Sequence, residues 1–189
     1  GWNTQSDGLG TTFTASTAVT ANITVYAQWT VLRSTGPGGG LVFYDKGSYS
    51  DGWRYMEAAP SDQSASAGWG CYGKEISGAD GTAIGTGAQN TADIWAGCAT
   101  AGIAARVAST TINGYSDWFL PSKDELNKIY INLKKGLDEN GITYTPVGGF
   151  ASNSYWSSSE RSAGNAWHQY FDLGGQNSLI KSNTYYVRA

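Results

Sequence analysis

One histidine, His168, is the chain's only side chain whose ordinary pKa suits general-base catalysis near neutral pH. Three serines, at 157–159, precede Glu160 and could in principle supply a nucleophile. The sequence, however, contains no Gly-x-Ser-x-Gly turn of the kind that exposes a catalytic serine. In an expected strand these serines have structural, hydrogen-bonding roles. We therefore expect no catalytic residues and no enzymatic activity.

The two cysteines, Cys71 and Cys98, leave two alternatives open. Cys98 lies on the apolar face of an expected helix, where a free thiol would act as a small buried hydrophobe. Alternatively, a disulfide to Cys71 would tie a long loop to that helix, and a secreted protein favours this pairing. Redox catalysis would instead require two free, exposed, reactive thiols.

Metal-binding patterns are absent from the sequence. One histidine and two distant cysteines do not have zinc-site spacing, and the aspartates follow no calcium-loop pattern. We expect no metal ligands and no cofactor. A structural calcium ion is not indicated, although the sequence leaves it open.

The segment 166–172 is expected to be a strand in which alternate residues face opposite sides. The side with two large apolar residues is assigned to the core: Trp167, Gln169 and Phe171. The other side is assigned to solvent: His168, Tyr170 and Asp172. An imidazole, a phenol and a carboxylate in a row suit adaptable ligand contacts, because tyrosine provides contact area at low entropic cost. An ordinary solvated strand face is the alternative.

A Gly174–Gly175 turn follows, and residues 177–180 are expected to form a loop. In this loop Leu179 and Ile180 either lie under the sheet or form an exposed apolar contact point.

Two expected helices position these segments. The first covers about 91–107, with Ile94, Cys98, Ala101 and Ala105 on one face. The second follows Pro121, begins with a Ser122–Glu125 capping box, carries an apolar stripe and ends at Gly136. Residues 61–90 are rich in Ser, Gly and Ala and predict a long loop. The remaining expected strands cover 41–44, 53–58, 155–159 and 185–189, with an extended lead-in or short strand at 118–120.

Composition limits the class of protein. Of the 189 residues, 14% are charged, 13% are aromatic and 26 are glycine, a mixture common in secreted, loop-rich β proteins. The net charge is −3 and no large Lys/Arg cluster occurs, so nucleic acid is not an expected partner. No apolar run is long enough for a transmembrane segment. The chain begins at Gly1 and its only methionine is Met56, so we expect it to derive from a longer precursor.

Residues 1–30 are expected to form a separate β unit, with alternating strands at 12–15 and 23–29. The unit carries the motifs Gly1-Trp2-Asn3-Thr4, Asp7-Gly8, Gly10-Thr11 and the run from Asn22 to Trp29. In these motifs it resembles the end of a Listeria–Bacteroides (InlB B-type) repeat. The resemblance implies a stalk of the kind found on bacterial surface proteins.

Residues 31–189 are expected to form the second domain, which contains a further set of motifs. They are Gly36-Pro37-Gly38-Gly39-Gly40, Gly52-Trp53-Arg54-Tyr55-Met56-Glu57, Asp117-Trp118-Phe119-Leu120-Pro121-Ser122, Tyr155-Trp156-Ser157-Ser158-Ser159-Glu160 and Tyr186-Val187-Arg188-Ala189. In these motifs the segment resembles the family labelled DUF1566, found at the C terminus of the Legionella collagen-like adhesin. The resemblance implies an α+β, C-type-lectin-like fold of the formylglycine-generating-enzyme branch, with two helices and a mainly antiparallel sheet.

The resemblance also implies a function. Related proteins of this fold group include variable proteins diversified by retroelements, whose C-terminal positions change while the scaffold stays constant. On this chain the positions implied to contact ligand are Asn165, His168, Tyr170, Asp172, Leu173, Asn177, Ser178, Leu179, Asn183 and Thr184. The expected protein is a secreted or cell-surface adhesin or receptor module, whose ligand is a protein or glycan on another cell or host. The alternative is a structural cap of a surface stalk that forms a homo-oligomer and has no ligand of its own.

Overall fold

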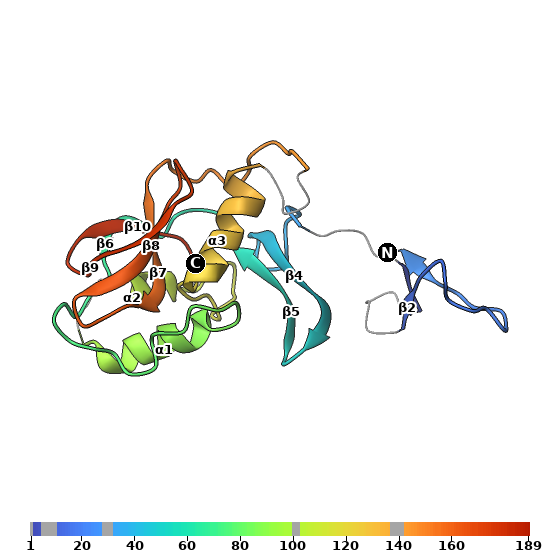
Figure 1. The fold of residues 1–189 in the computed structure, drawn as a ribbon, viewed down its shortest axis with the longest axis horizontal. Coiled ribbons are helices and arrows are strands. Elements are labelled where there is room, and N and C mark those ends of the chain that lie inside the picture. Colours follow the sequence, from blue (N-terminus) through green and yellow to red (C-terminus); the bar gives the residue numbers. More distant parts are fainter. Residues whose placement is uncertain (1, 5–10, 28–31, 100–102, 137–141) are drawn as a thin grey trace.

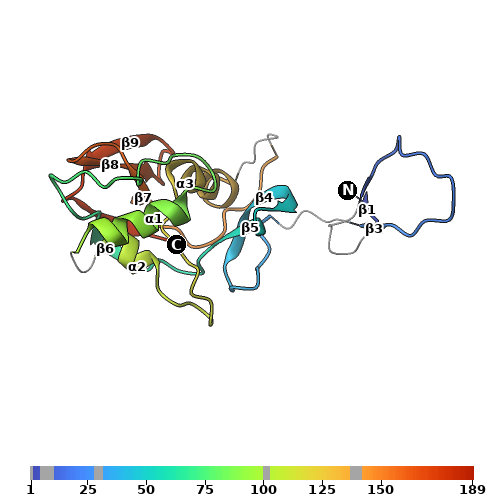
Figure 2. The same cartoon turned by 90° about the horizontal axis from the view of Figure 1, so that it is seen from below.

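The computed structural model describes residues 2–4, 11–27, 32–99, 103–136 and 142–189. At the N-terminal end, β1 (Trp2–Asn3) pairs antiparallel with β2 (Thr12–Phe13) and with β3 (Tyr26–Ala27). Figures 1 and 2 show this small sheet apart from the rest of the chain. The expected strand over 23–29 is shorter than predicted, and its last two residues, with the predicted domain boundary, lie outside the described residues.

The main sheet has five strands in the order β6-β10-β7-β8-β9 (Figure 1). They are β6 (Ser64–Gly68), β7 (Ser154–Glu160), β8 (Asn165–Tyr170), β9 (Gln176–Ile180) and β10 (Thr184–Val187). All neighbours are antiparallel except β10 and β7, which are parallel. With its helices this sheet confirms the α+β class. Two expected loops are wrong in part, because 61–90 contains β6 and 177–180 belongs to β9.

A separate hairpin joins β4 (Leu41–Ser50) to β5 (Trp53–Ala58). Asp51 and Gly52 at its tip both have positive φ, 51° and 85°, as a twisted two-residue hairpin turn requires. The glycine-rich segment before β4 packs tightly on β5, because a Cβ at Gly40 would lie 2.2 Å from the carbonyl oxygen of Ala58.

Helix α3 (Lys123–Ile129) begins as the sequence predicts. The Ser122 side chain accepts from the Glu125 N–H, and the Glu125 carboxylate accepts from the Ser122 N–H. These bonds satisfy two N–H groups that a helix start otherwise leaves free. The helix continues as a π-helical turn (Tyr130–Lys134), and Gly136 follows with a φ of 69°.

The helix expected over 91–107 is two helices, α1 (Gly87–Gly97) and α2 (Ala104–Ala108). The chain leaves the first helix at Cys98, whose backbone is extended with φ −121° and ψ 105°. Ala101 lies outside the described residues. The predicted single helix is therefore wrong in extent, because the backbone at Cys98 does not continue it.

Two apolar clusters hold the domain together. One joins Trp69 and Trp156 to residues of α1 and α2, including Ile94. The other lies among α3, β4 and the sheet, where Leu126 and Tyr155 pack with Phe171. The sheet is thus covered on both sides along its central strands. Helix α1 packs against β7, α2 packs against β6, and α3 packs against β8.

Candidate functional site

Strand β7 is the rigid support of the C-terminal strands, since each of its seven residues is buried. The Trp156 indole N–H donates to the Ala67 carbonyl oxygen at 2.9 Å, and the Tyr155 hydroxyl donates to Asp62 at 3.0 Å. These bonds satisfy the polar ends of two buried rings and fix their orientation.

His168 lies inside an aromatic cluster, not on the surface. Its imidazole is 1% exposed and stacks on the Tyr185 ring at a centroid distance of 5.3 Å. It meets Tyr170 and Trp156 edge-on at 4.6 and 6.1 Å. Neither ring nitrogen has a hydrogen-bond partner among the residues that the structure describes, and burial lowers the pKa of His168 to about 4. The histidine is therefore neutral at pH 7.

The predicted solvent-facing position of His168 is wrong for a clear reason. Simple alternation assumes that one side of a strand faces water, whereas β8 lies inside the sheet and rings from β7 and β10 cover its second side. The buried positions of Gln169 and Phe171 and the exposed position of Asp172 agree with the prediction, and Trp167 is half-buried.

Five side chains on or next to the side of the sheet that carries His168 form what we call the β8–β10 face: Tyr170, Asn177, Leu179, Asn183 and Tyr185. Asn177 is paired with His168 in the strand register, which places both on one side of the sheet. Leu179 is partly buried against the core. The Asn183 amide donates to the Tyr185 hydroxyl at 3.3 Å. Tyr185 is absent from the predicted set of contact residues. The available signal was its place at the start of the strand expected over 185–189.

Two predicted residues lie on the opposite side of the sheet. Ser178 pairs with Trp167, and Asn165 pairs with Ile180. Lys123 and Arg161 approach the Trp167 ring, with 4.8 and 5.1 Å to its centroid. The structure therefore divides the predicted set between the two sides of β8 and β9.

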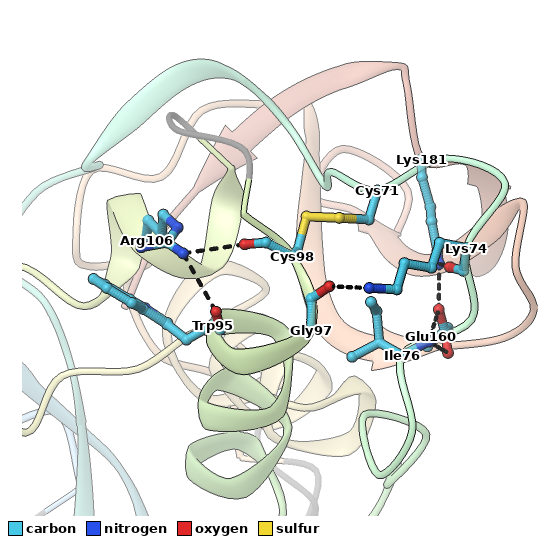
Figure 3. Close-up of a disulfide and its surroundings, with 9 residues drawn as sticks. All are labelled: Cys71, Lys74, Ile76, Trp95, Gly97, Cys98, Arg106, Glu160 and Lys181. Atoms are coloured by element: carbon cyan, nitrogen blue, oxygen red, sulfur yellow. Dashed lines mark hydrogen bonds and ion pairs between the residues drawn. A yellow bond between two sulfur atoms is a disulfide. The ribbon is translucent and has the colours of Figure 1, made fainter.

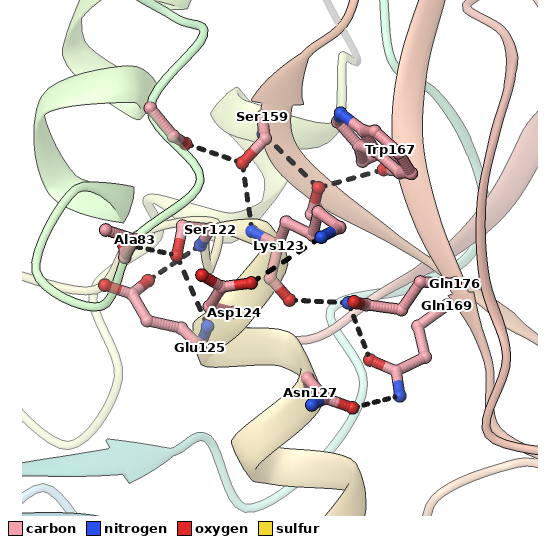
Figure 4. Close-up of polar contacts among 12 residues, drawn as sticks. Ala83, Ser122, Lys123, Asp124, Glu125, Asn127, Ser159, Trp167, Gln169 and Gln176 are labelled. Atoms are coloured by element: carbon pink, nitrogen blue, oxygen red, sulfur yellow. Dashed lines mark hydrogen bonds and ion pairs between the residues drawn. The ribbon is translucent and has the colours of Figure 1, made fainter.

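Amide side chains attach this opposite side to α3 (Figure 4). Gln169 donates to the Asn127 side chain at 2.9 Å, and Gln176 donates to the Lys123 carbonyl oxygen at 2.7 Å. Gln176 also donates to Gln169 at 3.2 Å. Buried amides bonded in this way hold β8 and β9 in one position relative to the helix.

The turn between β8 and β9 presents Asp172 and Leu173. Leu173 is 85% exposed, so its side chain is accessible from solvent. Gly174 and Tyr170 are joined by a backbone hydrogen bond of 2.7 Å. Gly174 has a φ of 80°, and a Cβ there would lie 2.4 Å from the Tyr130 ring, so only glycine fits. Thr184, also predicted, is exposed at the start of β10, opposite Gly68.

The serines before Glu160 have structural partners, and Figure 4 shows those of Ser159. The Ser157 hydroxyl donates to the Trp167 carbonyl oxygen at 2.9 Å. The Ser159 hydroxyl donates to the Gly81 carbonyl oxygen at 2.7 Å and accepts from the Lys123 N–H. Since the His168 nitrogens are unbonded, no Ser–His pair forms within the described residues.

Glu125 is a buried carboxylate beside these serines, and it connects α3 to the loop before α1. It accepts from the backbone N–H groups of Ser122 and Gly85, both at 2.7 Å. Burial raises the pKa of Glu125 in spite of these hydrogen bonds. Its partners are backbone groups within the scaffold, so its role is to position the loop.

Figure 3 shows how the loop after β6 is fastened. A disulfide joins Cys71 to Cys98, whose Cα atoms are 5.7 Å apart. A buried ion pair joins Lys181 to Glu160, and Lys181 also donates to the Lys74 carbonyl oxygen at 2.8 Å. Sequence reasoning missed this ion pair, because a long-range pair gives no local pattern.

Neither a metal centre nor a membrane helix is found in the part of the chain that the structure describes. No group of three His, Cys, Asp or Glu side chains there is close enough to hold a metal ion. No helix among the same residues is long and apolar enough to cross a bilayer.

Residues 48–189, three quarters of the chain, match the family model described as the Lcl C-terminal domain. No curated protein matches the chain. The predicted resemblance to the Legionella collagen-like family is confirmed by this match.

Proposed function

Because this chain belongs to the Lcl C-terminal domain family, we propose that it is a secreted or surface-displayed ligand-binding module of the adhesin type and not an enzyme. The ligand is a protein or glycan on another cell or host, and the β8–β10 face and the Asp172–Leu173 turn contact it. The observation that carries the proposal is the placement of partly exposed phenol, amide and leucine side chains on a fully buried support.

The geometry favours binding because the contact groups are already ordered. Tyr170 and Tyr185 have few rotatable bonds, and the buried His168 ring holds both of them in place. Side chains fixed before association lose little entropy on binding. In this proposal His168 positions the tyrosine rings and does not touch the ligand, a change from its predicted contact role.

We also propose that the contact positions are diversified by a retroelement, as in the variable proteins that the family resembles. Asp172, Leu173, Asn177 and Thr184 are exposed, so substitutions there leave the core unchanged. The flanking DNA tests this directly. A neighbouring reverse-transcriptase gene with an imperfect copy of the codons for residues 155–189 would support diversification, and the absence of both would refute it.

The binding proposal is tested with the triple variant Tyr170→Ala, Leu173→Ala and Asn177→Ala. Wild type and variant are applied to glycan and protein arrays and to adherent cells, after circular dichroism has shown that both are folded. Tyr49→Ala is the matched control, because Tyr49 is 56% exposed on the separate β4–β5 hairpin. We expect the triple variant to lose a ligand that wild type and control retain. Unchanged binding of a verified ligand by the triple variant would refute the proposal.

One observation favours the alternative of an oligomerising cap. Strand β9 is at the edge of the sheet, and Ile180 at its end is 45% exposed. An open edge with an exposed apolar residue can pair with a second copy. Analytical ultracentrifugation of the chain and of Ile180→Lys separates the two functions. A stable oligomer that Ile180→Lys dissociates supports the cap, and a monomer refutes it.

A further inference from the structure

A cavity of about 430 Å³ lies between the β4–β5 hairpin and the segments that lead into α1 and α3. None of its lining residues belongs to β8, β9 or β10. It is therefore separate from the proposed contact face.

Aromatic rings form much of the cavity wall: Trp53, Tyr55, Tyr115, Trp118 and Phe119. Tyr55 and Tyr115 are 39% and 44% exposed, so their rings are accessible from solvent. The Trp118 indole is buried and donates to the Ile112 carbonyl oxygen, which fixes its ring. Aromatic faces carry partial negative charge and attract cations.

Two carboxylates add to this negative potential, Glu57 and Asp117. Glu57 accepts only from the N–H groups of Gly38 and Gly40, at 3.4 and 3.2 Å, and pairs with no cation that the structure describes. Asp117 has neither hydrogen bond nor ion pair to any described residue. No lysine or arginine lines the cavity.

Nearby cations already use the rings of β5. The Lys46 ammonium lies 3.9 Å from the Trp53 ring centroid. The Arg54 guanidinium lies 4.8 Å from the Tyr55 ring centroid and pairs with Asp45 at 3.0 Å. These cations already occupy Trp53 and Tyr55, whereas among the described residues no cation lies over Tyr115, Trp118 or Phe119, so these three rings are the ones available to a ligand.

We propose that this cavity binds a quaternary alkylammonium group, as carried by choline or a phosphocholine headgroup. A primary ammonium has three N–H donors that require acceptors, whereas the wall is mainly apolar apart from the two carboxylates and the hydroxyl groups of Tyr55 and Tyr115. A trimethylammonium group has no N–H to satisfy, so an aromatic wall suits it. The two carboxylates attract its single positive charge.

The test is a titration of the whole chain with choline, followed by tryptophan fluorescence and by ligand-observed NMR. The neutral isostere 3,3-dimethylbutan-1-ol is titrated in parallel, because it has the same shape without the charge. We expect saturable binding of choline and at least about tenfold weaker binding of the isostere. No saturable binding of choline, or equal binding of the isostere, would overturn the inference.

Variants place the site. Tyr115→Ala is expected to weaken choline binding about tenfold, and Tyr115→Phe is expected to retain it, because the ring and not the hydroxyl makes the contact. Asp117→Asn should weaken binding less, by about threefold. Tyr72→Ala is the control, since Tyr72 is 64% exposed and does not line the cavity. Equal effects of Tyr72→Ala and Tyr115→Ala would count against the assignment.

A third titration identifies the source of the ligand. If glycerophosphocholine binds at least as tightly as choline, the ligand is a phosphocholine headgroup. If it binds more weakly than choline, the ligand is a cation without phosphate. Both rankings support a quaternary-ammonium site. These variants leave the β8–β10 face intact. Loss of choline binding would therefore leave binding of the protein or glycan ligand unchanged, and loss of that ligand would leave choline binding unchanged.

Discussion

His168 should make the stability of the folded domain sensitive to acid. Its imidazole is buried between rings without a hydrogen-bond partner, so protonation would place an unpaired charge in an apolar cluster. The variant His168→Phe keeps a flat ring against Tyr185 and removes the titrating group. We expect the two proteins to respond differently to acid and the variant to lose less stability.

The size of the effect follows from the two pKa values. In the unfolded chain the histidine has its ordinary pKa of 6.5, and in the folded domain burial lowers the pKa to about 4. The unfolded state therefore binds the proton more tightly, and stability falls as the pH decreases from 6.5 towards 4. The total loss is about 3 kcal/mol, of which about 2 kcal/mol appears between pH 7 and pH 5.

Urea unfolding at pH 7, 6, 5 and 4.5 measures this loss as the difference between wild type and His168→Phe. Glu125 acts in the opposite direction, because burial raises the pKa of its carboxyl group and favours the folded state as pH falls. That contribution is common to both proteins and cancels in the difference. Asp172→Asn, at an exposed position, should follow wild type. Parallel pH dependence in wild type and His168→Phe would refute the reasoning.

Three further changes test the scaffold by chemical or thermal denaturation. Cys98→Ser removes the disulfide to Cys71, which joins residues 27 positions apart in sequence, and should lower the free energy of unfolding by about 3.5 kcal/mol. An unchanged unfolding midpoint would argue against the disulfide. Lys181→Met leaves the Glu160 carboxylate buried without its cation and should cost about 3–5 kcal/mol, whereas adding Glu160→Gln should recover part of that loss. Ser122→Ala removes the helix cap and should cost about 1 kcal/mol, with a loss near zero counting against a capping role.

Local patterns predicted the start of α3 well. Ser122 and Glu125 are three residues apart, so both halves of the capping box lie within one turn and need no distant partner. The apolar stripe behind them, with Leu126 and Leu133, is buried as the helical spacing requires. The start of this helix is therefore determined by residues that are neighbours in sequence.

Long-range pairing set the limits of sequence prediction. Whether His168 is exposed depends on Tyr185, which lies in another strand and stacks on it across the sheet. Residues 64–68 contain no large apolar side chain, yet they form β6 because β10 supplies hydrogen-bond partners. Such partners are visible only once the strand order is known.

The position of β10 affects how the protein is made. This strand is the last of the sheet in sequence order, and it lies between β6 and β7, which are some 90 residues apart in sequence. Until residues 184–187 leave the ribosome, both strands expose unpaired inner edges and the sheet cannot close. Completion of the sheet therefore follows the synthesis of all its other strands and depends on contacts between distant segments. A chain cut short before Thr184 would present open edges to proteases, so only complete domains would persist.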